Sequence, residues 1–492
     1  MPGVIVQTAV RVGPNASSAV ETSQAFFVGK AARGPATEAK LVTSLAEFQA
    51  IYGGYASYSY LHPTVQSFFE EGGTRAWISR VVGANATTGT RTLTAAGVGG
   101  ANLITITANG PGAWSSGITV ETVNPGTAAG TFIIKIYDGG TLLFSTGNCT
   151  SVVQAVGRIN SSFTASKVVI ATNVAGAAAT LPENSAATAL SAGDDNEETV
   201  VDANYITGLE KFSESFGAGV VACPESHGTT VQTALATHAN TYNRIAFLNG
   251  AFDDTIAEAK TAGQTLSGAN ASGEHVAYFY PWVYIPTTTS GVNSLIPPVG
   301  YAAAKRAVAH TQVGAHKPGA GLISVAQFVN GVAIDIDKTN GDELDTASVN
   351  AIRVINNTIR IYGARSVSPD TTNFRYITAQ DVVNKVVVEA SRSLEDLIFT
   401  VIDGRNSIFS AVESKLAAIL EPLRLSGALF EAFETNGKRV DFGYSIKCDA
   451  SLNPTAQLAD GLVKAKVGLR VSSVGDKIEV DIVKSNLTKS VV

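Results

Sequence analysis

The chain has 492 residues, of which 15% are charged and 45% are apolar, and its formal net charge is −6. This length is sufficient for roughly two to four domains, each with its own core. Lys and Arg form no dense cluster, which argues against a nucleic-acid-binding protein, because neutralising phosphate groups requires a basic face.

The cysteines and the apolar runs restrict the class of protein further. Cys149, Cys223 and Cys448 lie far apart and form no zinc-ligand spacing, so they are typical of reduced or buried thiols in a protein made in a cytoplasm. The amino terminus lacks a basic segment followed by an apolar core, and no uninterrupted run of about 18 apolar residues occurs. We therefore expect a soluble protein without direct membrane insertion.

Both ends of the chain show a strand pattern that has no evident partner beside it in sequence. A strand at a chain end leaves backbone groups unpaired, and it becomes ordered most easily by adding to the edge of a sheet, often in another subunit. Two interpretations stay open, namely strand exchange between subunits and pairing of the two termini within one molecule. The alternating residues are Val4, Val6, Thr8 and Val10 near the start, and Ile478, Val480 and Ile482 near the end.

Residues 22–83 show the succession of strand, helix, helix and strand that is typical of an α/β sheet. The apolar runs at residues 24–29 and 76–82 predict buried strands. Thr43 or Ser44 is placed to cap a short helix, and residues 63–71 predict a second helix that ends at a pair of glycines.

Residues 84–194 differ sharply in composition, since Ala, Gly, Thr and Ser dominate and charged side chains almost vanish. We expect a mainly β insertion, with one helix near residues 152–159. The acidic run at Asp194, Asp195, Glu197 and Glu198 marks its end and is typical of a solvated linker. Strand patterns recur at residues 103–107, 118–122, 132–137 and 168–171.

The α/β pattern resumes after the insertion. Apolar runs at residues 219–223, 244–248 and 275–284 alternate with helical patterns, which predicts parallel strands covered by helices on both faces. The central domain is therefore predicted to be split into residues 22–83 and 195–350.

Residues 351–475 are predicted to form a compact α+β domain. Thr378 with Asp381 resembles a capping box at the start of a helix, and a second helix begins near Ser407, with Pro422 bending or ending it. The apolar stripe of this second helix contains Phe409, Val412, Leu416, Leu420 and Leu423. Strands are predicted at residues 440–448, 463–471 and 478–482.

The complete prediction is a multidomain fold of the α/β plus α+β class. A split central α/β domain carries a mainly β insertion and is followed by the α+β domain and by strand-exchanging terminal arms. The predicted boundaries are 1–21 for the amino-terminal arm, 22–83 with 195–350 for the split domain, 84–194 for the insertion, 351–475 for the α+β domain and 476–492 for the carboxy-terminal arm.

Motifs that carry catalysis or cofactor binding are missing from the sequence. It contains no GxxxxGK loop followed by Ser or Thr, no GxSxG elbow, no HExxH helix and no EF-hand loop. His310 and His316 are close in sequence, but their spacing does not place both on one helical face, which favours structural or surface roles over metal ligation. We expect no catalytic residue, no cofactor and no metal site. The densest carboxylate group, which is more typical of a polar loop than of a calcium site, contains Asp335, Asp337, Asp342, Glu343 and Asp345.

Several short segments, taken in their order and spacing, resemble the contractile tail sheath proteins of bacteriophages and related injection machines. The insertion shows no such similarity, and residues 314–319 depart from the Ala-Pro-Ala-Asn-like stretch that is commoner in the family, which leaves open the branch to which the chain belongs. The similar segments are residues 22–29, 33–35, 41–44, 53–54, 67–69, 72–73, 77–81, 297–300, 342–344, 349–353, 359–365, 425–429 and 453–454.

The resemblance implies a structural subunit rather than an enzyme. Stacked rings of this homo-oligomer would form a helical sheath around a tail tube protein, with baseplate and tail terminator proteins at the two ends. Terminal arms would add strands to the inner domains of neighbours, and contraction would drive the tube through the host envelope for genome delivery. The resemblance places such a protein in the virion, assembled in the host cytoplasm. For the inner domain, the candidate tube contacts are Arg405, Glu413 and Lys415.

Other functions stay open on the sequence alone. The chain is also compatible with the sheath of a secretion or extracellular injection system. A different class is an α/β enzyme that binds a nucleotide or a sugar at the carboxyl ends of its sheet. A self-assembling surface or adhesion protein is suggested by the Ala/Gly/Thr-rich insertion, although no secretory signal supports it.

Overall fold

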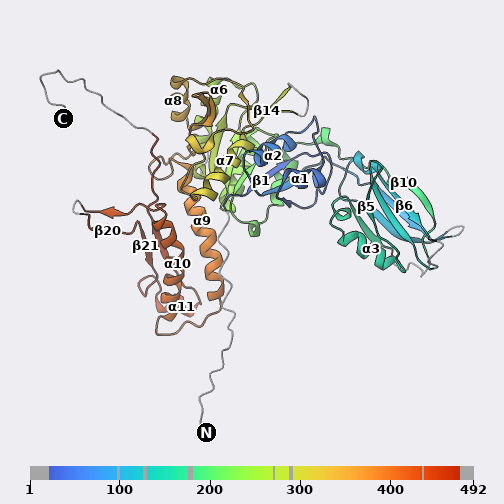
Figure 1. Ribbon diagram of the computed structural model, residues 1–492. Helices are drawn as coiled ribbons and strands as arrows, with labels where there is room; N and C mark the ends of the chain where they lie inside the picture. Colours follow the sequence, from blue (N-terminus) through green and yellow to red (C-terminus); the bar gives the residue numbers. More distant parts are fainter. Residues whose placement is uncertain are drawn as a thin grey trace, which may run out of the picture. The chain divides into compact units, whose positions relative to one another are not determined.

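The computed structural model describes residues 22–96, 100–125, 130–174, 181–269, 272–287, 292–434 and 437–476. The chain divides into two compact units, Met1–Glu395 and Asp396–Val492. The first unit contains a large sheet with its helices and a β-rich insertion, which can be followed in Figure 1. The predicted terminal strands, with Val4, Val6, Thr8, Val10, Ile478, Val480 and Ile482, lie outside the described residues.

An eight-stranded sheet forms the centre of the first unit, with the strand order β18-β17-β13-β12-β11-β1-β3-β2. The inner strands run parallel, and the edge strands β2 and β18 are antiparallel to their neighbours. The strands are β1 (Ala25–Gly29), β2 (Lys40–Val42), β3 (Ala76–Arg80), β11 (Val220–Ala222), β12 (Ile245–Asn249), β13 (Val276–Tyr280), β17 (Val349–Ile355) and β18 (Thr358–Ile361).

Each face of this sheet is covered by helices, so neighbouring residues of one strand belong to different cores. In β1, Phe27 packs in the core that contains α1, α2 and α7, whereas Phe26 and Val28 pack in the core that contains α4, α5, α6 and α8. Burial on both faces explains why the strand sequences are continuously apolar. The helices are α1 (Leu45–Tyr52), α2 (Leu61–Glu70), α4 (Asp202–Glu210), α5 (Thr229–Thr241), α6 (Ile256–Ala269), α7 (Val299–Gln312), α8 (Lys338–Thr346) and α9 (Ile377–Leu394).

The local predictions for this unit are mostly confirmed, with one difference. Of the two predicted caps of α1, Ser44 is the one observed, since its side chain accepts a hydrogen bond from the backbone N–H of Glu47. The run at residues 275–284 forms two strands in different sheets, because the chain leaves β13 at Pro281, whose nitrogen cannot donate to a ladder. The second strand, β14 (Val283–Pro286), lies between β15 (Asn293–Ile296) and β16 (Gly331–Val332) in a small antiparallel sheet.

The central sheet extends further along the chain than the sequence analysis expected. The predicted boundary at residues 350 and 351 falls inside β17, which pairs with β13 through Tyr278 and Val349. The helix α9 also belongs to the first unit, because that unit ends at Glu395. Periodicity identifies a strand but carries no information on which sheet it joins, and this is the reason for the difference.

The insertion has a hydrophobic core of its own, made of residues between Leu93 and Leu190. Its strands form one sheet in the order β4-β5-β9 and another in the order β10-β6-β7-β8. The elements are β4 (Thr90–Thr94), β5 (Asn102–Ala108), β6 (Ile118–Val123), β7 (Ile133–Asp138), β8 (Thr141–Ser145), β9 (Val169–Asn173), β10 (Ser185–Ala189) and the helix α3 (Val152–Ser161).

Arg80, the last residue of β3, holds the insertion at its junction with the sheet. Its side chain is fully buried, and Nη2 lies 2.5 Å from Oδ2 of Asp195. The guanidinium also donates hydrogen bonds to the carbonyl oxygens of Ala31, Gly34 and Pro111. One side chain therefore joins the end of β3 to the loop after β1, to Pro111 inside the insertion and to Asp195, where the chain leaves the insertion.

The prediction of a solvated linker is wrong for Asp195, because this carboxylate neutralises the buried Arg80. The backbone of the neighbouring Asp194 pairs with that of Thr87, with N to O distances of 2.6 and 2.9 Å. The chain segments that enter and leave the insertion are thus bonded side by side. An acidic run gives no local sign of a cation more than a hundred residues away, so only the fold reveals this pair.

The carboxy-terminal unit contains the helices α10 (Ser407–Leu425) and α11 (Thr455–Ala459). The predicted apolar stripe of α10 is confirmed, since its residues are buried together with Ile408, but Pro422 lies inside the helix instead of ending it. The predicted strand at residues 440–448 is divided at Gly443, whose φ of 74° is left-handed. The strands are β19 (Ala432–Phe433), β20 (Arg439–Asp441), β21 (Tyr444–Lys447) and β22 (Lys466–Leu469).

Replacement of Asp195 tests the importance of the junction. Asp195→Asn should lower the free energy of unfolding by about 3–5 kcal/mol, because it leaves a buried guanidinium without a counter-charge. The measurement is the urea midpoint, with Glu198→Gln, which removes an exposed carboxylate of the same acidic run, as the matched control. Equal urea midpoints for the two variants would contradict the role of Asp195 as the counter-charge of the buried Arg80.

Candidate assembly interface

The first possible site lies at the carboxyl ends of β1 and β11, where the order of connection along the sheet reverses. Open α/β sheets generally bind ligands at such a point. Here the carboxylate of Glu225 accepts hydrogen bonds from the backbone N–H of Lys30 at 2.9 Å, the hydroxyl of Ser59 at 2.6 Å and that of Tyr205 at 2.9 Å. Desolvation raises the pKa of Glu225. The position at which a ligand would bind is therefore occupied by a carboxylate of the chain itself, and this carboxylate already has hydrogen-bond partners.

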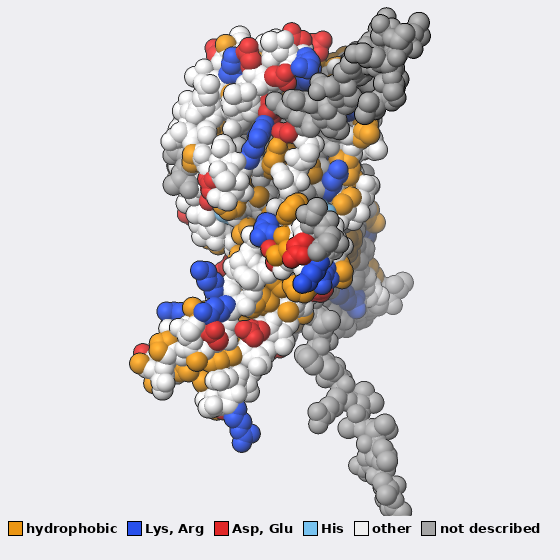
Figure 2. All heavy atoms as spheres, turned by 90° about the vertical axis from the view of Figure 1, so that its left-hand side faces the viewer, with side chains coloured by type: hydrophobic (Ala, Val, Ile, Leu, Met, Phe, Trp, Pro, Cys, Tyr) orange, Lys and Arg blue, Asp and Glu red, His pale blue; other side chains and the backbone are white. Residues whose placement is uncertain are grey.

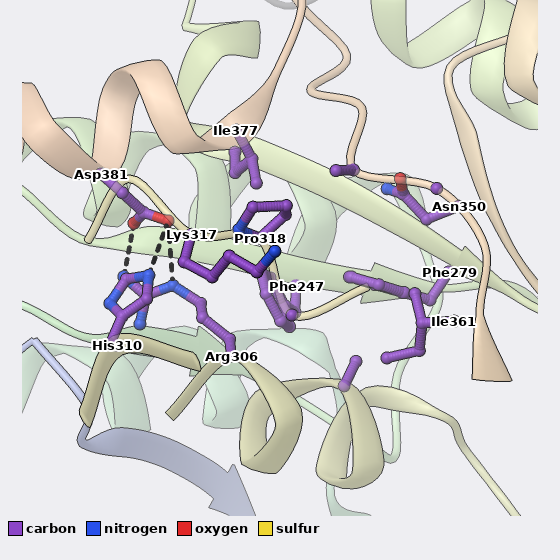
Figure 3. Close-up of a pocket in the computed structure, with 14 residues that line it drawn as sticks. Phe247, Phe279, Arg306, His310, Lys317, Pro318, Asn350, Ile361, Ile377 and Asp381 are labelled. Atoms are coloured by element: carbon purple, nitrogen blue, oxygen red, sulfur yellow. Dashed lines mark hydrogen bonds and ion pairs between the residues drawn. The ribbon is translucent and has the colours of Figure 1, made fainter. Parts of the chain in front are cut away.

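A second polar cluster joins α7 and α9 and borders a small pocket (Figure 3). Nε and Nη2 of Arg306 bind the two carboxylate oxygens of Asp381, and Nη1 donates to the carbonyl oxygen of Thr22 at 2.7 Å. His310 closes the cluster, with Nδ1 at 3.0 Å from the Thr22 hydroxyl and Nε2 at 3.4 Å from Asp381. We call these four buried residues the Arg306 ring.

The predicted capping box of Thr378 and Asp381 is wrong. The helix begins at Ile377, and the residue before it, Tyr376, makes no side-chain cap. Asp381 is only 1% exposed and faces Arg306 instead of the start of its own helix. The buried guanidinium of Arg306 competes with the local backbone N–H groups for the carboxylate of Asp381. It prevails because charge-assisted bidentate hydrogen bonds are stronger than a hydrogen bond to a neutral N–H group.

The electrostatics of the Arg306 ring fix its charge state. Burial and the positive charge of Arg306 lower the pKa of His310 to about 4. Asp381 lies beside Arg306 and His310, and these groups keep its pKa below the ordinary value although burial opposes the shift. At neutral pH the ring therefore contains one cation, one anion and a neutral imidazole, which matches the structural role expected for His310.

The predicted polar loop is wrong for Asp342, Glu343 and Asp345, which lie on α8, whereas Asp335 and Asp337 precede the helix. Asp337 caps α8 by accepting from the backbone N–H of Asn340. The three helical carboxylates are paired with cations of the chain, as Lys338–Asp342, Lys260–Glu343 and Arg365–Asp345. In the described ranges of the chain, no group of three or more His, Cys, Asp or Glu residues is placed to hold a metal ion.

The predicted tube-contact residues lie along α10 and just before it. Arg405 is exposed at the start of the helix. Glu413 accepts a hydrogen bond from the backbone N–H of Cys448 at 3.0 Å, at the end of β21, and Nζ of Lys415 lies 2.7 Å from Asp396. Two of the three side chains therefore already have partners within the unit, and Arg405 is the most accessible of them.

The sheet of β21 and β22 has open edges. Arg470 donates to the carbonyl oxygen of Gly443, and the antiparallel alternation then directs the N–H groups of Ile446 and Val467 away from the partner strand. Among the described residues, no third strand pairs with this sheet. A two-stranded sheet is marginally stable by itself, so its edges are suited to receive strands from elsewhere.

Large apolar side chains lie on the surface at the hairpin of β19 and β20 and just before β21. Phe433 is 56% exposed, Val440 61% and Phe442 44%. The guanidinium of Arg439 lies 4.2 Å from the centre of the Phe442 ring. Figure 2, which views the side of the molecule that carries β20, shows orange side chains gathered among blue and red ones there. Aromatic groups combined with arginine are typical of protein interfaces.

The sequence analysis missed the buried arginines. Arg244 is fully buried, and its guanidinium donates to the carbonyl oxygens of Phe212, Ser213 and Gly217. Burial lowers its pKa to about 9. An arginine directly before an apolar run, as in residues 244–248, is a weak signal, because the same pattern also occurs at solvated strand ends.

The chain was compared with protein families, curated proteins and solved structures. No family model and no curated protein matches the chain. Solved structures match it along most of its length, although the sequence identities are low. A sheath tail protein from Listeria innocua has a TM-score of 0.61 and 12% identity, covering 88% of this chain and 90% of its own. The helical sheath of the anti-feeding prophage in its contracted state has a TM-score of 0.58 and 12% identity, covering 99% of both chains.

A third match is the sheath complex of the extracellular contractile injection system PVC in its contracted state. Its TM-score is 0.55 at 14% identity, and it covers 98% of this chain and 99% of that one. The chain therefore has the fold of the sheath proteins of contractile tails and injection systems. No helix in the described ranges combines the length and the apolar character needed to cross a membrane.

The buried histidines predict acid lability. Burial lowers the pKa of His310 to about 4 and that of His238 to about 3, below the ordinary value of 6.5. The unfolded chain therefore binds protons between pH 6.5 and 4 that the folded chain does not, and the stability present above pH 6.5 is lost as the pH falls. Asp381, with a lowered pKa, also destabilises the fold as the pH falls, but at lower pH. Glu225, with a raised pKa, has the opposite effect on the pH dependence of stability.

The measurement is the urea midpoint at pH 7, 6, 5 and 4. The free energy of unfolding should fall by on the order of 2–3 kcal/mol per buried histidine over this range. His310→Gln should reduce the slope, while His227→Gln, at an exposed position, should not. Identical slopes for these two variants would show that His310 is not the titrating group.

Proposed function

We propose that the chain is the structural subunit of a contractile sheath, which polymerises helically around a tail tube and contracts to drive the tube through the envelope of a target cell. The observation that carries the proposal is the sheath-protein fold along nearly the whole chain. In this role the subunit is not an enzyme and needs no cofactor. Its partners are further copies of itself, the tube protein, and the proteins of the baseplate and tail terminator.

The open-edged sheet of the carboxy-terminal unit supports this role. The strand patterns at residues 4–10 and 478–482 have the length and alternation needed to add to its outer edges. Head-to-tail contacts of this kind do not close a ring by themselves and generate helical filaments. Strand exchange keeps the copies linked while the subunits rotate and slide as rigid bodies.

A metastable assembly supplies the energy of contraction without a nucleotide. In this mechanism the extended sheath is held kinetically and relaxes into a more extensively packed form when released. The filled switch point at Glu225 agrees with it, because a sheet that binds a nucleotide or a sugar requires this position to be free. The competing α/β enzyme is therefore the weaker candidate.

Two kinds of sheath fit the comparisons. The similar proteins include phage-like sheath tail proteins and the sheaths of extracellular injection systems. A phage tail delivers a genome and its sheath belongs to the virion, whereas an injection system delivers other cargo. We propose a phage-type tail and keep the injection system as the second candidate, because the family that the segments resemble includes both. Identifying nucleic acid in purified particles would distinguish them.

Removal of the amino-terminal strand should block assembly. A chain lacking residues 1–14 should stay a folded monomer, because the central sheet and its two cores are built from residues after position 21. It should form no sheath tubes in electron micrographs. Normal tubes from the truncated chain would defeat the strand-exchange proposal.

Blocking the receiving edge should have the same effect. Val467→Pro removes an N–H group that points away from β21, so the ladder within the unit stays intact while an added strand loses a donor. Tube formation should decrease strongly in Val467→Pro and persist in the control Val467→Thr, which keeps the donor. Unimpaired assembly of the proline variant would exclude this edge as the receiving site.

Charge reversal tests contact with the tube. Arg405→Glu should weaken co-assembly with tube protein most at low salt, because exposed charges are screened as the ionic strength rises. Lys415→Glu and Glu413→Lys are expected to act less selectively, since they also break bonds within the unit. The measurement is tube co-sedimentation at several salt concentrations, and no effect of Arg405→Glu would remove it from the interface.

A further inference from the structure

The Arg306 ring joins three chain segments that are far apart in sequence. Thr22 comes just before β1, Arg306 and His310 lie on α7, and Asp381 lies on the second turn of α9. Figure 3 shows the side chains of Arg306 and His310 directed from one helix toward Asp381 on the other. Hydrogen bonds join Thr22 to His310 and to Arg306, and Arg306 to Asp381, and Nε2 of His310 lies 3.4 Å from Asp381.

This cluster joins the first described residue of the chain to the last long helix of the first unit. Toward the amino terminus, Thr22 is directly preceded by residues 1–21, which contain the predicted exchange strand. Toward the carboxy terminus, α9 is the last long helix of the first unit, which ends at Glu395. The segments that would link this unit to other copies and to the carboxy-terminal unit are thus bonded to each other through two side chains of α7.

The held part of α9 is its amino-terminal half. Fully buried positions on this helix extend from Ile377 to Val386 and include Asn384, whose amide donates to the carbonyl oxygen of Arg244. Beyond Val386 the helix has no buried residue, and Val387 is 39% exposed. The bidentate pair of Arg306 and Asp381 therefore fixes the helix close to where it enters the core.

We propose that the Arg306 ring is a force-transmitting junction, through which a pull on the amino-terminal segment reaches α9 without first loading the ladder of β1. The inference rests on the proposed function, because strand exchange supplies the pull. Arg306 Nη1 holds the carbonyl of Thr22 before the chain enters β1, so tension is passed to α7 and across the ion pair to Asp381. A buried bidentate pair suits this task, because its geometry is fixed and water does not compete for it.

A purely structural ring makes a different prediction from a junction. If the ion pair only stabilised the fold, breaking it would weaken resistance to force in every direction. The mechanical effect of a junction depends on the direction of the load. A load applied between two segments that the ring does not connect is not carried by the ring.

The test is single-molecule pulling on the full chain. One pair of handles is attached at the amino terminus and at position 391, an exposed Ser on α9. A second pair, at the exposed Glu210 and Thr265, loads the same unit through a stretch of chain that contains no member of the ring. Asp381→Asn should shorten the lifetime at constant force about tenfold for the first pair and by less than about twofold for the second, where tenfold in rate equals about 1.4 kcal/mol.

Two further variants control for general destabilisation. Glu389→Gln removes a carboxylate from the same helix, paired at 3.8 Å with Lys385, and should leave both lifetimes unchanged. The double variant Arg306→Met with Asp381→Leu replaces the ion pair by apolar groups, which often preserves stability. This double variant should keep the urea midpoint of the unmodified chain. Its lifetime at constant force should be shorter only when the load is applied through the first pair of handles. Equal losses along both axes, or no loss for Asp381→Asn along the first, would overturn the proposal.

The pulling experiment uses single subunits, so its result does not depend on sheath formation. Tubes of the unmodified chain in electron micrographs test the proposed function separately. If tubes form but the lifetime losses are equal in both directions, the function stands and the junction is rejected. If the losses are directional but the chain never polymerises, the ring still transmits force and the proposed function fails.

Discussion

Desolvation of charge is the constraint on which the first unit depends. A parallel sheet covered on both faces removes water from the ends of its strands, where the chain nevertheless carries arginines, lysines and carboxylates. Each such group must therefore find a partner inside the protein. Glu71 illustrates the solution, since its carboxylate lies 2.6 Å from Nζ of the buried Lys305 and accepts from the backbone N–H groups of Gln327, Phe328 and Val329.

The same constraint connects packing to function. At the switch point Glu225 and its partners occupy the position that a ligand would take. At the junction with the insertion, Arg80 binds Asp195, where the chain leaves the insertion, and Pro111 within it. The buried pairs are rigid joints between elements that are far apart in sequence. Such joints fix the elements of the first unit to one another without disulfides, since Cys149 and Cys223 are free thiols.

The carboxy-terminal unit has the opposite character. Its helix α10 buries a regular stripe, but the strands around it are short and paired two by two, and aromatic side chains such as Phe433 and Phe442 face solvent. The unit is therefore suited to be completed by contacts with other chains. A subunit with one self-sufficient part and one incomplete part is the arrangement that a linked but movable polymer requires.

The sequence by itself determined the elements whose signal is local. The strand at residues 24–29, a helix cap at Thr43 or Ser44, the separate composition of residues 84–194 and the apolar stripe of α10 are all set by neighbouring residues, because periodicity and capping act over a few positions. The tertiary structure alone decided that β17 joins the central sheet, that Asp381 binds Arg306 instead of capping its own helix, and that Asp195 neutralises Arg80. These contacts join residues more than seventy positions apart, and a charge or an apolar run has no local feature that names its distant partner.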